Sequence, residues 1–129
     1  MDGRFLPDTN ILIALFAGDE SVQTQLGQAS EIFISIIAIG ELYYGARKSG
    51  RAEANLQRVD ELAAGSVILN CDLETAQYYA VIKNDLKLAG KPIPENDIWI
   101  AAIALQHDLI LVTRDAHFKA VPNLAVESW

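Results

Sequence analysis

Short apolar runs alternate with longer helical stretches along nearly the whole chain, and this alternation constrains the fold more than any other feature. It is typical of α/β proteins, because parallel strands need a crossover connection, usually a helix, between them. The runs that have the length and composition of strands are residues 4–7, 32–35, 67–69, 109–112 and 124–127. We therefore predict a central parallel sheet with helices packed on it.

Capping residues and glycines mark where the helices begin and end. Asp, Ser and Thr side chains accept hydrogen bonds from the free N–H groups at a helix start, and glycine commonly ends a helix. The residues expected to cap helix starts are Asp8, Ser21, Ser35 and Asp72, and the glycines expected to end helices are Gly65 and Gly90. A further helix is expected over residues 95–106, after a rigid Pro92–Pro94 connector. Pro7 has no N–H and is disfavoured in a central strand, so the first strand is expected to end there.

The composition predicts one globular domain that spans residues 1–129. The chain is 51% hydrophobic and 21% charged, which excludes a disordered protein. The longest nearly uncharged apolar run, residues 32–40, is far below the roughly 20 residues needed to cross a membrane. No signal peptide is visible at the N-terminus, and Cys71 is the only cysteine, so a reducing cytoplasm is the expected location. The net charge of −7 argues against broad, charge-driven binding of nucleic acid but leaves room for a small basic patch.

Four of the 17 acidic residues lie in apolar surroundings instead of polar stretches. They are Asp8, Glu41, Asp97 and Asp115. Asp8 directly follows an expected strand, Asp115 lies just past another, and Glu41 and Asp97 lie on the apolar faces of expected helices. Each has an ordinary structural explanation: a helix cap for Asp8, an internal ion pair for Glu41, a favourable helix dipole for Asp97 and a turn cap for Asp115. A parallel sheet could nevertheless gather all four in one cleft, since its strands end at the same edge.

Four carboxylates in one cleft cannot all remain ionised without a counter-ion. A set of oxygen ligands without His or Cys suits Mg²⁺ or Mn²⁺. Such an ion activates water and stabilises displacement at phosphorus. Asn10 and Thr113 are expected to orient the carboxylates or their waters. His107 and His117 are interpreted as having no catalytic role, because metal-activated water needs no histidine base.

At these residues the sequence resembles the PIN-domain ribonucleases, specifically the VapC-type toxins of bacterial toxin–antitoxin pairs. The motifs that carry the resemblance are FLPDTNILIAL at 5–15, ISIIAIGELYYGA at 34–46, IPENDIWIAA at 93–102, LVTRDAHF at 111–118 and LAVESW at 124–129. Pro7 departs from the aliphatic residue that commonly precedes the first aspartate of the family. The last acidic position is often Asn in the family, which leaves open whether Asp115 is a ligand or only a helper.

The resemblance implies a three-layer α/β/α domain and Mg²⁺- or Mn²⁺-dependent cleavage of RNA. It assigns the acidic site to Asp8, Glu41, Asp97 and Asp115, with Asp8 and Asp97 as the first candidates for direct metal ligands. It also implies a homodimer and a small antitoxin that covers the site. The RNA itself has to be held by local basic patches, for which the candidates are Arg47, Lys48 and above all Arg114, beside Asp115.

Three other classes of protein are alternatives to this prediction. A phospho-acceptor receiver domain has a similar length and an acidic Mg²⁺ pocket, but that class shows paired acids after the first strand, where Asp8 stands alone. A phosphatase with an aspartyl nucleophile usually has a second acid two residues later, where this chain has Asn10. The third alternative is a PIN fold that binds RNA or protein without cleaving.

Overall fold

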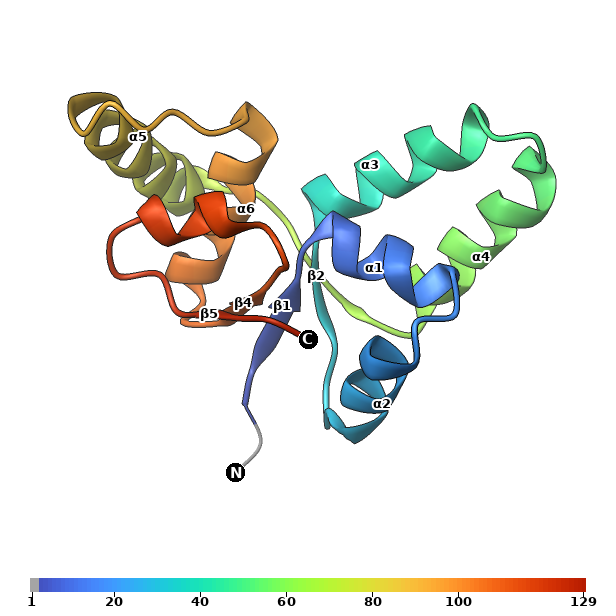
Figure 1. Cartoon of the computed structure of the whole chain (residues 1–129). Helices are drawn as coiled ribbons and strands as arrows, with labels where there is room; N and C mark the ends of the chain where they lie inside the picture. The colour runs from blue at the N-terminus through green and yellow to red at the C-terminus, as the bar shows by residue number, and fades with distance from the viewer. Residues whose placement is uncertain (1–2) are drawn as a thin grey trace.

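Short parallel strands form the middle layer of the computed structural model, which describes residues 3–129. The strands are β1 (Phe5–Pro7), β2 (Phe33–Ser35), β3 (Val67–Leu69), β4 (Ile110–Val112) and β5 (Val126–Glu127). The helices are α1 (Thr9–Phe16), α2 (Glu20–Gln28), α3 (Ile36–Arg47), α4 (Ala52–Ala64), α5 (Leu73–Leu88) and α6 (Glu95–Gln106), with a 3₁₀ helix, η1, at Ala116–Ala120. Helices α1–α4 lie on one side of the strands and α5, α6 and η1 on the other, which gives the expected three layers (Figure 1).

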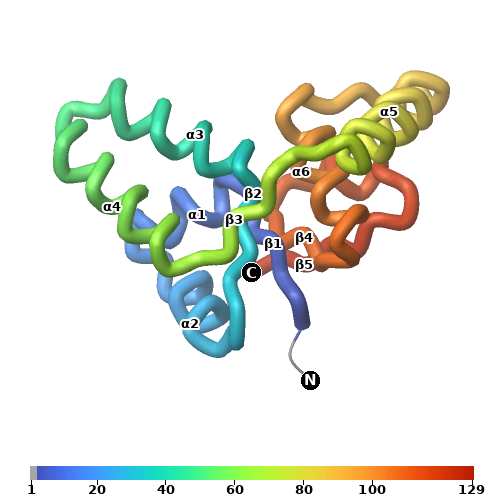
Figure 2. The backbone as a smooth tube through the Cα atoms, turned by 180° about the vertical axis from the view of Figure 1, so that it is seen from behind, coloured from blue at the N-terminus to red at the C-terminus, as the bar shows by residue number. Residues whose placement is uncertain are grey.

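All strand pairings are parallel, and their register determines which residues meet at the sheet edge. β4 lies between β1 and β5 in one ladder, and β2 pairs with β3 in a second. β1 and β2 also contact each other, so the two ladders lie side by side. Pro7 is opposite Val112, which makes Asp8 and Thr113, the next residue of each chain segment, neighbours at the carboxyl end of the sheet. Figure 2 shows β3 leading the chain from the side of α4 to α5.

Pro7 is tolerated because its nitrogen faces away from the strand with which β1 pairs. The Asp8 N–H donates to Val112 O at 2.9 Å, and the Ile110 N–H donates to Arg4 O at 2.8 Å. Successive N–H groups of a strand point to opposite edges, so the Pro7 nitrogen points toward β2 instead of β4. The missing donor lies where the two ladders adjoin without pairing. The strand therefore ends at Pro7, as predicted.

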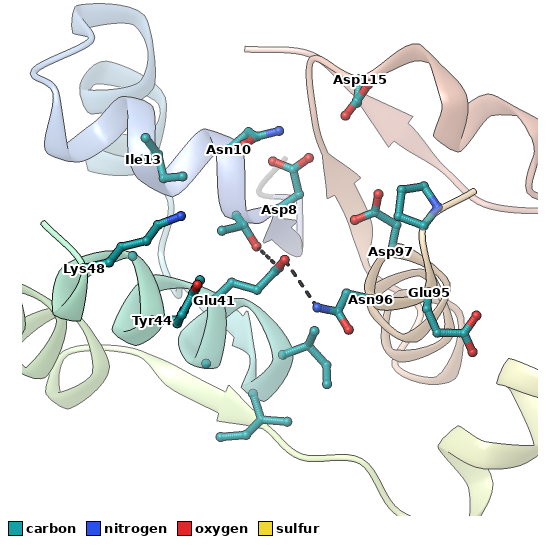
Figure 3. A pocket seen from close by; sticks show the side chains of 16 residues that line it. Asp8, Asn10, Ile13, Glu41, Tyr44, Lys48, Glu95, Asn96, Asp97 and Asp115 are labelled. Atoms are coloured by element: carbon teal, nitrogen blue, oxygen red, sulfur yellow. Dashed lines mark hydrogen bonds between the residues drawn. The ribbon is translucent and has the colours of Figure 1, made fainter.

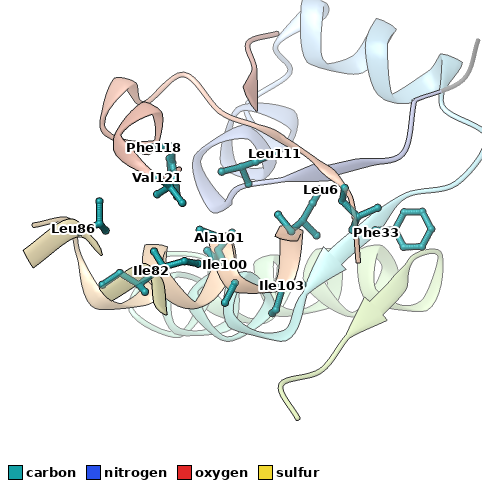
Figure 4. Packing of buried hydrophobic residues seen from close by; sticks show 14 residues of the cluster. Leu6, Phe33, Ile82, Leu86, Ile100, Ala101, Ile103, Leu111, Phe118 and Val121 are labelled. Atoms are coloured by element: carbon teal, nitrogen blue, oxygen red, sulfur yellow. The ribbon is translucent and has the colours of Figure 1, made fainter. Parts of the chain in front are cut away.

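The strands bury alternate side chains on the two opposite faces of the sheet, in three hydrophobic clusters. Leu6 and Leu111 pack with α6 and with Phe118 in the largest cluster, where Ile100 and Ile103 are fully buried (Figure 4). On the opposite side, Ile34 of β2 packs with α1, α3 and α4, and Val112 of β4 packs with α1 and α2. Both faces of the sheet are covered, which accounts for the nearly continuous apolar sequence of β4.

The helix boundaries follow the capping signals closely, with one correction. Asp8, Ser35 and Asp72 accept N–H bonds at the starts of α1, α3 and α5 as predicted. The start of α2 is capped by Asp19, and Ser21 lies inside the helix. The Asp19 side chain accepts from Val22 N at 3.1 Å. Helix α6 has the predicted bounds, and none of the helices in residues 3–129 combines the length and apolar composition needed to span a membrane.

Candidate acidic metal site

A cavity of about 1040 Å³ opens at the carboxyl edge of the sheet, and all four singled-out carboxylates line it. Asp8 follows β1, Glu41 lies on α3, Asp97 lies in the first turn of α6, and Asp115 follows β4. Their side chains point into the same space in Figure 3. The fold thus brings together four residues that are spread over more than 100 positions of the sequence.

Asp8 is the most buried of the four, with 4% of its surface exposed. One carboxylate oxygen accepts from Ile11 N at 3.0 Å, and the other accepts from the Thr113 hydroxyl at 2.6 Å. Burial raises the pKa of Asp8 above its ordinary value, and the nearby charge of Asp115 raises it further. The donors Thr113, Ile11 and Asn10 oppose that rise without cancelling it.

Glu41 is held by two donors from other elements. The Thr9 hydroxyl donates to one of its oxygens at 2.6 Å, and the Asn96 amide donates to the other at 3.4 Å (Figure 3). Neither donor was anticipated from the sequence, although each is adjacent to a singled-out acid. Asn10, which was expected to orient a carboxylate, lines the cavity, whereas Thr9 is the residue that contacts Glu41.

His117 connects the two remaining carboxylates. Its Nε2 lies 2.8 Å from Asp97 Oδ2, and its Nδ1 lies 3.2 Å from Asp115 Oδ1. Burial raises the pKa of Asp97, with smaller contributions from the charges of Glu41 and Asp8, while the contact with His117 lowers it. The sequence interpretation set His117 aside, and its position two residues after Asp115 was the only available signal.

The donor set fits a small, hard divalent cation. It offers carboxylate, hydroxyl and amide oxygens, and within residues 3–129 no Lys or Arg forms an ion pair with any of the four acids. Burial is the main cause of the raised pKa of Asp8 and Asp97, and repulsion between neighbouring carboxylates adds to it. A bound cation opposes both effects, because it favours the ionised carboxylates. In the described part of the chain, no group of three or more Asp, Glu, His or Cys side chains lies close enough together to hold a metal ion. The fit to the cation therefore rests on the chemistry of the donors that share the cavity.

The basic residues expected to hold RNA are placed differently from one another. Lys48 lines the cavity, with its Nζ 4.9 Å from the centre of the Tyr44 ring. Arg47 is exposed and is not among the residues that line the cavity. Arg114 points elsewhere: its guanidinium pairs with Asp19 at 2.9 Å and donates to the Trp129 carbonyl at 2.7 Å. These contacts link Arg114 to the start of α2 and to the end of the chain, so its guanidinium is already engaged, and its role in binding RNA stays a prediction.

Comparisons with known proteins agree with this architecture. The PIN domain model matches residues 5–124. Ribonuclease VapC2 of Haemophilus influenzae is 35% identical, and tRNA(fMet)-specific endonuclease VapC of Salmonella typhimurium is 30% identical, each over 98% of both chains. The crystal structure of VapBC2 from Rickettsia felis, bound to a DNA fragment from their promoter, has a TM-score of 0.89 and 30% identity, and covers 97% of this chain and 98% of that one.

The chain therefore belongs to the PIN-domain family and, within it, to the VapC ribonuclease toxins of toxin–antitoxin systems. This assignment rules out two of the competing classes, the receiver domain and the aspartyl phosphatase. The third alternative, a PIN fold that binds without cleaving, is a question of activity and is decided by experiment.

Proposed function

We propose that this protein is a Mg²⁺- or Mn²⁺-dependent endoribonuclease that acts as the toxin of a toxin–antitoxin pair. Its reaction is the hydrolysis of phosphodiester bonds in tRNA or another structured RNA. The observation that carries the proposal is the convergence of Asp8, Glu41, Asp97 and Asp115 on one open cavity. The names of the relatives, which include a tRNA-specific endonuclease, support RNA as the substrate class.

In this proposal each residue of the cavity has a separate task. Asp8 and Asp97 are the ligands of the metal, which lowers the pKa of a water and neutralises charge at the phosphate when it is bound. Thr113 keeps the Asp8 carboxylate in place through its 2.6 Å hydrogen bond. Thr9 and Asn96 fix the Glu41 carboxylate. Glu41 and Asp115 then orient water or add negative charge that helps to hold the metal. Lys48 at the cavity wall supplies a contact for RNA.

The exposed apolar surface supports the two proposed protein partners. Ile13, Ile36 and Tyr44 are exposed at the cavity wall, and an antitoxin segment that buried them would also close the site. Leu73, Val81 and Leu88 are exposed on α5, and their spacing of eight and seven residues puts them on one side of the helix. We propose that this side of α5 contributes to a homodimer. Light scattering of the protein alone and with its antitoxin measures both assemblies.

The direct test of the function is cleavage of RNA resolved on a gel. Total tRNA and a generic single-stranded RNA are incubated with the protein and Mg²⁺, Mn²⁺ or EDTA. We expect discrete fragments that require the metal and fall by more than about 100-fold in Asp97→Asn, since even residues that only support a metal ligand are worth about 10- to 100-fold. Asp108→Asn is the matched control, because Asp108 is exposed, precedes β4 at the opposite edge of the sheet and has a positive φ of 53° that Asn tolerates.

The other outcomes are equally informative. Fragments that persist in EDTA, or that are unchanged in Asp97→Asn, contradict the four-carboxylate mechanism. No cleavage of any RNA by folded, metal-binding protein would favour the alternative, a PIN fold that binds RNA or protein without cutting it.

A further inference from the structure

Three of the ten Lys and Arg side chains form an ion pair or a side-chain hydrogen bond within residues 3–129, and the other seven do not. Lys83 pairs with Glu95 at 3.2 Å, Arg114 pairs with Asp19, and Arg58 donates to the Phe16 carbonyl at 2.6 Å. Within residues 3–129, Lys91 and Lys119 form no ion pair or side-chain hydrogen bond. Both are exposed, and they are free to bind an external anion.

These two lysines line the same hollow, beside the acidic site. The hollow has a volume of about 370 Å³ and lies between the connector before α6 and the 3₁₀ helix η1. Its remaining lining comes from Pro92, Ile93 and the residues Ala116, His117 and Ala120. His117 also contacts Asp97 and Asp115, so one imidazole separates the hollow from the carboxylates. His117 is thus the residue common to the hollow and to the contacts with Asp97 and Asp115.

The hollow has the charge that an RNA strand requires. A strand whose reacting phosphate lies at the carboxylates has to place its neighbouring phosphates close to a protein of net charge −7. Lysine ammonium groups bind phosphate as point charges. Two like charges around one hollow also repel each other, and an anion between them removes that repulsion. The apolar floor of Pro92 and Ile93 offers no competing acceptor side chain.

The geometry points to a phosphate-binding subsite for RNA in the hollow lined by Lys91, Lys119 and His117, which takes a backbone phosphate next to the one that is cleaved. This inference rests on the proposed ribonuclease function and adds to it a second point of contact for the RNA backbone. The subsite is expected to recognise phosphate and not base sequence. Its lysine ammonium groups bind backbone phosphates, and such contacts carry no sequence information directly.

The neighbouring hollow provides a matched control. It shares Pro92 and Ile93 but is lined by Lys83, Lys87 and Glu95, and the Lys83–Glu95 pair neutralises much of its charge. Lys87 lies four residues before Lys91, and it is exposed like Lys91. Lys87→Gln therefore removes the same charge from nearly the same part of the surface without touching the proposed subsite.

The experiment measures steady-state cleavage by Lys91→Gln, Lys119→Gln, the double variant and Lys87→Gln, with Mg²⁺ present. A contact to a phosphate that does not react raises KM and leaves kcat unchanged. We expect KM to rise about 5-fold for each single substitution, as for the loss of an exposed charge-assisted contact. The slope of log affinity against log salt should decrease by about 0.7 per lysine removed, as for single-stranded nucleic acid. Lys87→Gln should match the wild type in both quantities.

A substrate series adds a second readout. Oligonucleotides shortened stepwise from either end lose, at one step, the phosphate held in the hollow. At that step the KM of the wild type should rise to the KM of the double variant. The KM of the double variant should be the same for the oligonucleotides just before and just after that step. Wild-type KM and salt slope in the double variant would overturn the subsite, as would an equal effect of Lys87→Gln or a fall in kcat alone. A wild-type protein that cleaves no RNA would instead contradict the proposed function.

Discussion

Thr113 shows how a single buried hydroxyl organises the acidic site. It is 2% exposed, donates to Asp8 Oδ2 and accepts from the Asp115 N–H at 3.0 Å. It therefore sets the positions of two of the four acids at once. Thr113 was selected from the sequence as a helper of the carboxylates, whereas Thr9, Asn96 and His117 were not. Polar side chains beside an acid are common in any sequence, and only their contacts across the fold distinguish these three.

Replacing Thr113 by Val tests this hydroxyl with little change of shape. We expect cleavage to fall by about 10- to 100-fold, as for other groups that orient metal ligands. The free energy of unfolding should decrease by about 1–3 kcal/mol, because a buried carboxylate oxygen and a backbone N–H lose their partners. Since the Thr113 hydrogen bond lowers the pKa of Asp8, its loss should also shift the acidic limb of activity to higher pH. Thr113→Ser retains the hydroxyl and is the control; equal activity of the Val and Ser variants would contradict this role.

At the scale of elements, helix α3 carries Glu41 to the cavity, and its start is fixed by Ser35. The Ser35 side chain is fully buried and accepts from Ala38 N at 3.0 Å. It also ends β2, so one residue sets where the strand stops and the helix begins. Both features were predicted from the sequence, because capping is a local interaction that a short segment specifies by itself.

Removing this cap should weaken the element that holds Glu41. Ser35→Ala is expected to lower the free energy of unfolding by about 1 kcal/mol, measured by urea denaturation. Asp72→Ala removes the cap of α5, a helix that carries none of the four acids, together with the hydrogen bond from Gln106 Nε2, and should cost at least as much. Only Ser35→Ala should also reduce cleavage, through a less ordered Glu41. A loss of activity of the same size in both variants would mean that general destabilisation, and not the position of α3, is responsible.

At the scale of the whole molecule, the ionised carboxylates of the acidic site lower the stability of the folded state, and binding of a metal ion or of protons restores it. Folding raises the pKa of Asp8 and Asp97, so the folded state binds protons more tightly than the unfolded state. The resulting destabilisation is fully present above the folded pKa values, and it disappears as the pH falls through them toward the ordinary value of 3.8. Cleavage should decline over the same window, because metal ligands must be ionised.

Thermal unfolding of the double variant Asp8→Asn, Asp97→Asn checks this balance. At neutral pH without metal, we expect it to unfold at a higher temperature than the wild type. The buried charges whose pKa folding raises are removed, while Asn retains the helix cap at position 8. The difference should shrink as the pH approaches 4. At an Mg²⁺ concentration of 100 times Kd, the wild type should gain about 2.7 kcal/mol and the double variant nothing. A stability difference that does not change with pH or Mg²⁺ would show that burial and mutual repulsion of these carboxylates do not destabilise the folded state.

The sequence by itself determined the helices and strands and identified the four candidate acidic residues of the site. Alternating short apolar runs, caps and glycines are local signals, and they predicted helix α6 to the residue as well as the ends of β1 and β2. Carboxylates in apolar surroundings are costly wherever they occur, so Asp8, Glu41, Asp97 and Asp115 could be chosen without a structure. The tertiary structure alone decided what lies around them. Ion-pair partners and shared cavities depend on contacts between distant segments, which is why Arg114 binds Asp19, His117 joins two acids, and Lys91 meets Lys119 at one hollow.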